Sequence, residues 1–295
     1  MYSIQNNLLK IVVNETGAEL CEISSVKNSL QFMWDANPNV WGSYAPNLFP
    51  VIGSLKNDQV IIEGKPYNIP KHGFTRRNSD VKLVSKSENE LVFSLKYNQE
   101  LLEIYPYKFE FIISFTLKDN RISINHTVKN LDDKTMYFSV GGHPAFKCPL
   151  VEGESYSDYY LEFEHNETSE SYLINMDNGL IKSESFSIIN RNKIDLHYDL
   201  FNKDALVFKD LKSRKVSLKS NTSGTILTVD FPGFPFLGIW AKPHADYVCI
   251  EPWIGIADSE DHDQDFTKKE GIQTLKAGES FNAVYSIEID PKHLV

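Results

Sequence analysis

The sequence is poor in cysteine and in long apolar segments. Only three cysteines occur among 295 residues, and Cys21, Cys148 and Cys249 lie too far apart to show the short spacing of a metal site. A sparse, odd number of cysteines is typical of free thiols in a reducing compartment. No apolar segment approaches the roughly 18 residues of a membrane span, and the first residues lack the basic and apolar segments of a secretory signal. We therefore expect a soluble, cytoplasmic protein.

The sequence also lacks an excess of positive charge. Lysine and arginine number 30 against 40 aspartate and glutamate residues, which gives a net charge of −10 and a pI near 5.3. This balance argues against a nucleic-acid partner and against attachment to an anionic membrane surface.

Helical periodicity is a further absence, because no segment keeps an apolar repeat for three turns. Alternation dominates instead, most clearly over residues 108–118, where every second side chain is apolar. Residues 121–129 continue the pattern with His126 on the apolar face, so we expect His126 to be a core histidine. Other segments with the character of strands are residues 8–13, 19–23, 30–34, 91–95, 159–164, 205–208, 215–219, 225–231, 236–242, 246–252 and 283–289, with a hairpin at 60–69.

This pattern predicts an all-β fold, a large antiparallel β-sandwich formed by one domain over residues 1–295. Residues 165–200 are weakly patterned and predict loops with short elements. Residues 37–50 are dense in proline, asparagine and aromatic residues, which fits either a packed surface loop or the rim of a ligand site.

The segment Ser139–Phe146 holds the first candidate for chemistry. Two glycines allow another backbone or a ligand to approach closely, because no Cβ stands in the way. Pro144 then favours an extended backbone at the preceding residue, His143. His143 is therefore either an ordinary loop histidine or an imidazole held still at the end of a strand.

Glu251 is the second candidate, because it ends an apolar strand just before Pro252 and Trp253. A carboxylate at such a place is costly to desolvate without partners. It is either a rim carboxylate paired with a lysine or a general base tuned towards neutrality.

Asp204, the acidic segment 258–265 and Glu270 are further polar candidates. Asp204 precedes an apolar strand, and either starts it in solvent or accepts hydrogen bonds from hydroxyl groups. The acidic segment 258–265 lacks the glycine and final glutamate of an EF-hand loop, so we expect a solvated loop there. Glu270 is expected to be exposed. No phosphate-binding glycine loop, catalytic serine signature or zinc motif occurs.

Three short motifs, taken together and in order, resemble the aldose 1-epimerases (galactose mutarotases), closest to the bacterial branch that includes the LacX proteins. They are His72-Gly73-Phe74, Gly141-Gly142-His143-Pro144 and Ile250-Glu251-Pro252-Trp253. Asn47-Leu48-Phe49-Pro50 with Gly53, and Lys276-Ala277-Gly278-Glu279, fit as well. The resemblance covers nearly the whole chain.

The resemblance implies a large twisted β-sandwich that binds a monosaccharide on its concave face without a cofactor or metal. By resemblance, His143 is the general acid and Glu251 the general base. The other residues that it implies for sugar binding are His72, Asp204, Asn47, Arg76, Phe74 and Trp253. It leaves the assembly state open between a monomer and a homodimer.

The resemblance is not complete. The family often carries arginine after Gly53, where this chain has Ser54; Lys56, Arg76 and Arg77 are the cations that offer a substitute. Related enzymes act on hexose 6-phosphates, and Lys71, Arg76 and Arg77 either suit a phosphate or are solvent-exposed. Their exposure is the expectation here.

The expected activity is interconversion of the α- and β-anomers of a free hexose. Alternatives are a carbohydrate-binding or sensor protein without turnover and a hexose 6-phosphate mutarotase. A glycoside hydrolase ranks last, because Glu251 has no evident carboxylate partner in the sequence.

Overall fold

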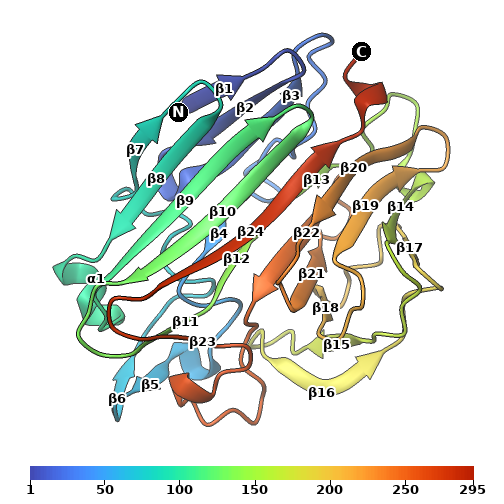
Figure 1. Cartoon of the computed structure of the whole chain (residues 1–295). Coiled ribbons are helices and arrows are strands. Elements are labelled where there is room, and N and C mark those ends of the chain that lie inside the picture. Colours follow the sequence, from blue (N-terminus) through green and yellow to red (C-terminus); the bar gives the residue numbers. More distant parts are fainter.

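The computed structural model describes residues 1–295 as two large antiparallel sheets, with three smaller ones beside them (Figure 1). The first large sheet has nine strands in the order β17 (Lys193–Asp195), β14 (Tyr159–Phe163), β19 (Lys215–Ser220), β20 (Gly224–Asp230), β24 (Ser280–Ile289), β10 (Arg121–Asn130), β9 (Phe109–Lys118), β8 (Glu90–Lys96) and β7 (Lys82–Lys86). The predicted all-β sandwich is confirmed.

The second large sheet carries the site. Its order is β16 (Ile181–Phe186), β15 (Ser171–Ile174), β18 (Leu206–Phe208), β21 (Phe236–Trp240), β22 (Tyr247–Ile254), β12 (Val140–Gly142) and β4 (Asn47–Leu48), and β13 (Ala145–Lys147) also pairs with β22. The smaller sheets are β1 (Tyr2–Gln5), β2 (Leu9–Asn14) and β3 (Glu19–Ser25); β5 (Val60–Ile62) and β6 (Lys65–Tyr67); β11 (Met136–Phe138) and β23 (Gln273–Leu275).

Helices are few and short. One α-helix, α1 (Gln99–Ile104), is accompanied by five 3₁₀ turns at Thr16–Ala18, Lys56–Asp58, Tyr156–Asp158, Phe266–Lys268 and Pro291–His293. None of the helices has the length and apolar character that crossing a membrane requires.

The alternating pattern of β9 and β10 places one face of the nine-stranded sheet in the core. Burial alternates residue by residue along both strands, as the sequence predicts. The main core comprises 72 buried residues and draws on both large sheets. His126 is fully buried there, and its Nε2 lies 2.9 Å from Oδ1 of Asn47 on the opposite sheet. The prediction of a core histidine is confirmed.

The eight-stranded sheet is covered on both faces, and this positions the site. Leu206 and Phe208 of β18 belong to the main core, whereas Val207 between them belongs to a smaller apolar cluster with Trp253. Since neighbouring strand residues point to opposite faces, the smaller cluster lies on the face turned away from the sandwich core. All eight residues of β22 are buried as a result.

The expectation of a strand over residues 30–34 was wrong. Residues 30–34 form only isolated bridges, because their backbone N–H groups bond to two different partners: Phe32 to Ile23 and Trp34 to Ala145.

Helix α1 has six residues, too few to show a helical period in the sequence. Asn98 caps it by accepting a hydrogen bond from the backbone N–H of Leu101.

The acidic segment 258–265 is not the wholly solvated loop that we expected. Its first residue, Asp258, is buried, and its Oδ1 lies 2.7 Å from Nζ of Lys269, which is also buried. Oδ2 of Asp258 accepts a hydrogen bond from the backbone N–H of Lys56. The backbone carbonyl of Asp258 accepts a hydrogen bond from the backbone N–H of Ile181. The buried lysine, eleven residues away, compensates the charge. Glu270 is exposed, as predicted.

Candidate active site

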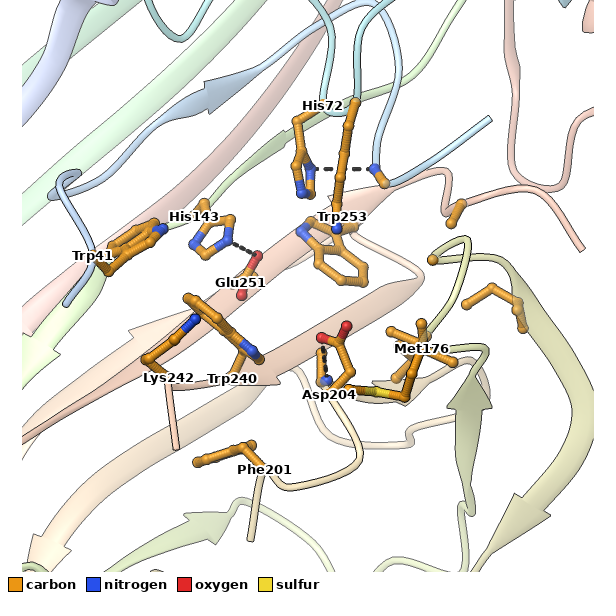
Figure 2. Close-up of a pocket in the computed structure, with 18 of the residues that line it drawn as sticks. Trp41, His72, His143, Met176, Phe201, Asp204, Trp240, Lys242, Glu251 and Trp253 are labelled. Carbon is orange, nitrogen blue, oxygen red and sulfur yellow. Dashed lines mark hydrogen bonds and ion pairs between the residues drawn. The ribbon is translucent and has the colours of Figure 1, made fainter. Parts of the chain in front are cut away.

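A cavity of about 470 Å³ opens on the outer face of the eight-stranded sheet (Figure 2). A volume of this size is typical of pockets for small molecules. Strands β18, β21 and β22 supply its base, and loops from distant parts of the chain surround it. Its lining residues are Trp41, Gly53, Lys71, His72, Arg76, His143, Ile174, Met176, Gly179, Ile181, Phe201, Asn202, Asp204, Ala205, Val207, Trp240, Lys242, Pro243, Glu251, Trp253 and Ala257.

His143 lines the cavity, and the two glycines before it are tightly packed. A Cβ on Gly141 would lie 2.7 Å from the carbonyl oxygen of Pro252, and one on Gly142 would lie 2.5 Å from the hydroxyl oxygen of Tyr285. The sequence prediction that these glycines admit a close approach is confirmed. The backbone N–H of His143 donates to the carbonyl of Pro46, which fixes the chain at this point.

The His143 ring is also held by aromatic neighbours. It stacks on Trp41 at 5.0 Å between ring centroids and meets the edge of Trp240 at 5.9 Å. Its Nδ1 atom is buried and has no hydrogen-bond partner. The imidazole is therefore well positioned but keeps unused hydrogen-bonding capacity.

Glu251 lies on the cavity face of β22, opposite Gly238 of β21. Its exposed fraction is 1%, so it is not a carboxylate at the rim. Its Oε2 atom lies 3.2 Å from Nε2 of His143, a contact that Figure 2 marks with a dashed line. By hydrogen-bond geometry this oxygen has no partner. The structure thus brings together two side chains that lie 108 residues apart in the sequence.

Burial opposes charge on both members of this pair. Desolvation lowers the pKa of His143 to about 3, and the positive charge of Arg76 contributes in the same direction. Desolvation, with a contribution from the nearby Asp204 carboxylate, raises the pKa of Glu251 well above its ordinary value. Burial therefore favours a neutral imidazole beside a protonated carboxyl group, and one proton transfer converts this pair into imidazolium and carboxylate.

His72 lies on the other side of His143, with ring centroids 5.7 Å apart. The backbone N–H of Gly53 donates to Nδ1 of His72 at 3.2 Å, so the neutral ring carries its proton on Nε2. Burial is the main cause that lowers the pKa of His72 well below its ordinary value, and the cations Lys71 and Arg76 act in the same direction. A neutral His72 can therefore donate one hydrogen bond.

Asp204 enters from the loop before β18 and lines the same cavity. Its Oδ1 accepts from the backbone N–H of Ala205 at 2.7 Å, and its backbone has φ of 72°.

Across the cavity, the ring of Trp253 lies where a Cβ on Gly238 would be, since that Cβ would approach the ring to 2.3 Å. The absence of a side chain at Gly238 therefore makes room for the Trp253 ring beside β21.

Six of the predicted site residues line the cavity: His143, Glu251, His72, Asp204, Arg76 and Trp253. Asn47 does not, and that prediction needs correction. Its amide nitrogen donates to the carbonyls of Gly17 and Ala18, while its oxygen faces His126. The side chain is buried between the two sheets and has no capacity left for a ligand.

Phe74 also lies outside the cavity. Its ring packs against Phe49, Tyr105 and Phe109 in the aromatic part of the core. It follows His72 and Gly73 closely, but its side chain stabilises the loop rather than facing the hollow.

The cations near the cavity differ in exposure. Lys71 and Arg77 are exposed, as expected, whereas Arg76 is half-buried and its Nε has no hydrogen-bond partner. Lys56 donates to the carbonyl of His262 instead of facing the cavity. Of the three proposed substitutes for an arginine after Gly53, only Arg76 lines the cavity.

Several residues that line the cavity were not predicted from the sequence. Ile174, Met176 and Phe201 come from the weakly patterned region and its continuation, and Lys242 follows β21. No local motif marks them; the turn glycine Gly179, with φ of 73°, is the one signal in that region.

The fold is that of the galactose mutarotase-like β-sandwiches. Residues 1–288 match the sequence model of the aldose 1-epimerases, and the chain belongs to the aldose 1-epimerase family.

Individual relatives agree with this membership. The chromosomal LacX protein of Lactococcus lactis subsp. lactis is 38% identical over 265 residues, which cover 87% of this chain and 88% of that protein. A galactose mutarotase related enzyme from Lactobacillus acidophilus is 38% identical, with a TM-score of 0.92 over 98% of this chain and 97% of that one. A galactose mutarotase-like protein from Lactobacillus casei is 28% identical, with a TM-score of 0.91 over 98% and 100% of the two chains.

Proposed function

We propose that this protein interconverts the α- and β-anomers of a free hexose by general acid–base catalysis. The observation that carries the proposal is the 3.2 Å approach of His143 to Glu251 inside a sugar-sized cavity. Anomerisation moves protons on two oxygens bonded to the same carbon, so its acid and base must lie next to each other.

The mechanism requires one base and one acid at C1. Transfer of the carboxyl proton of Glu251 to His143 gives a carboxylate and an imidazolium. Glu251 then removes the proton of the C1 hydroxyl while His143 protonates the ring oxygen, and the C1–O5 bond breaks. The aldehyde rotates about C1–C2, and the same steps in reverse close the ring on its other face.

Each positioned acid or base contributes a factor of roughly 10²–10⁴ in rate. Proton transfers suffice for every step, so the mechanism assigns no role to a metal or an organic cofactor.

The other lining residues have binding roles in this proposal. His72, with its proton on Nε2, donates a hydrogen bond to a sugar oxygen near C1. Asp204 accepts from ring hydroxyls, and Trp240 and Trp253 offer apolar ring faces to the C–H surface of the sugar. Arg76, with its unpartnered Nε, donates to a distal sugar oxygen.

Polarimetry on freshly dissolved α-glucose and α-galactose tests the proposal. We expect the protein to accelerate the change in rotation well beyond the spontaneous rate. If calorimetry shows sugar binding while the rate stays at the spontaneous value, the protein is a sugar-binding or sensor protein instead.

The same assay addresses phosphorylated substrates. Lys71, Arg76 and Lys242 all line the cavity, and this observation favours trying glucose 6-phosphate beside glucose. A higher kcat/KM for the phosphorylated sugar would make hexose 6-phosphates the preferred substrates.

All three cysteines are free, which supports a cytoplasmic site of action.

A further inference from the structure

The acid–base pair has a third potential ligand beside it. His143, Cys249 and Glu251 each offer one donor atom, and these three atoms lie within 4.8 Å of one another. Cys249 and Glu251 are two residues apart on β22, so their side chains share the cavity face of that strand. His143 comes from the adjoining segment after β12.

These donors suit a particular class of ion. One imidazole nitrogen, one thiolate and one carboxylate form a mixed set that fits Zn²⁺ and similar borderline-soft cations. Ligand atoms around a tetrahedral zinc ion lie about 3.3–3.6 Å apart, given the usual bond lengths. Nε2 of His143 and Oε2 of Glu251 are already 3.2 Å apart, so Cys249 needs to approach by only about 1 Å to complete the set.

A second observation points to a ligand. Oε2 of Glu251, one of the proposed ligand atoms, is buried and lacks a hydrogen-bond partner. Oxygen-binding cations such as Mg²⁺ prefer several carboxylates and waters, which a pocket walled by Trp41 and Trp240 does not supply.

We propose that His143, Cys249 and Glu251 form an inhibitory site for Zn²⁺. On binding, the Cys249 thiol releases its proton to solvent, as does the Glu251 carboxyl group where it is protonated, and three protein–zinc bonds form. The fourth position faces the cavity and takes water. Zn²⁺ thus occupies the lone pairs that proton transfer needs, and it excludes the sugar from C1 contact with the pair.

Binding is measured first, because it does not depend on activity. Co²⁺, a spectroscopic substitute for Zn²⁺, is titrated into the intact chain. We expect one equivalent to produce the near-ultraviolet charge-transfer band of a thiolate ligand, and one equivalent of Zn²⁺ to abolish it. Cys249→Ala should lose the band and weaken Zn²⁺ binding at least about tenfold. Cys249→Ser keeps the side-chain volume and should also lose the band.

Cys21→Ala is the matched control, since Cys21 is another buried free thiol, on β3. It should retain both the band and the affinity. An unchanged band in Cys249→Ala, or a band lost in Cys21→Ala, would overturn the proposed site.

Inhibition is measured second, and this arm rests on the proposed function. Zn²⁺ should slow mutarotation in competition with sugar, while the same concentration of Mg²⁺ should have no effect. Each variant is compared with its own rate without metal, and Cys249→Ala should resist Zn²⁺ at least about tenfold better than the wild type. Activation by Zn²⁺, or equal inhibition by Mg²⁺, would contradict the inhibitory role. Absence of mutarotation with an intact cobalt band would reject the proposed function but not the metal site.

Discussion

Replacement of Lys269 by methionine should be among the most destabilising single changes in this protein. Lys269 and Asp258 have side-chain exposures of 0%, and their charged atoms lie 2.7 Å apart. Desolvation lowers the pKa of Lys269 although Asp258 opposes this effect. Methionine preserves the volume but leaves the Asp258 carboxylate buried without its counter-ion. Breaking a buried pair in this way costs about 3–5 kcal/mol.

The measurement is the free energy of unfolding from urea titration. Lys269→Met alone should lower it by about 3–5 kcal/mol. Asp258→Asn combined with Lys269→Met should recover part of the loss, because no buried charge remains and the side-chain oxygen can still accept from Lys56. A cost below about 1 kcal/mol for Lys269→Met, or a double variant as unstable as the single one, would refute the reasoning.

Three further predictions concern His126, His72 and Gly238. Burial lowers the pKa of His126 to about 3, below its unfolded value of about 6.5, so the unfolded state binds an extra proton between these pH values. Stability is therefore lost as pH falls from 6.5 towards 3, and His126→Gln should reduce this slope by about 1.4 kcal/mol per pH unit in urea titrations at pH 4–6; an unchanged slope would contradict burial of a neutral His126. His72→Asn should raise KM several-fold with a smaller effect on kcat in polarimetric assays, and a normal KM would place His72 outside the sugar site. Gly238→Ala should displace the Trp253 ring, raise the dissociation constant for sugar in calorimetry and cost about 1–3 kcal/mol of stability. Gly42→Ala is the control and should change neither the sugar affinity nor the stability, because its Cβ would lie 3.6 Å from its nearest neighbour. Wild-type sugar affinity in Gly238→Ala would contradict the placement of Trp253.

Local physics explains which strands the sequence could predict. β9 and β10 each bury one face, so their apolar residues recur at every second position and can be read directly. Helix α1 and segment 30–34 could not be read in this way. The first is shorter than two turns, and the second depends on hydrogen bonds to partners far along the chain.

The candidate site shows the same division. Gly141 and Gly142 predicted a close approach beside His143, and the neighbouring carbonyl and hydroxyl oxygens provide it. The position of Asn47 depends on packing instead: its polar side chain satisfies backbone carbonyls between the sheets, which no local pattern reveals. Met176 lines the cavity because the fold brings its loop there, and the sequence of that loop shows no pattern that would predict this position.

The most direct test of the account is the mutarotation rate of α-galactose and α-glucose with His143→Ala and Glu251→Gln. Circular dichroism and sugar calorimetry on the same samples establish that each variant is folded and how well it binds sugar. The account predicts that each variant remains folded and loses a factor of roughly 10²–10⁴ in kcat. Wild-type rates in both variants would contradict it.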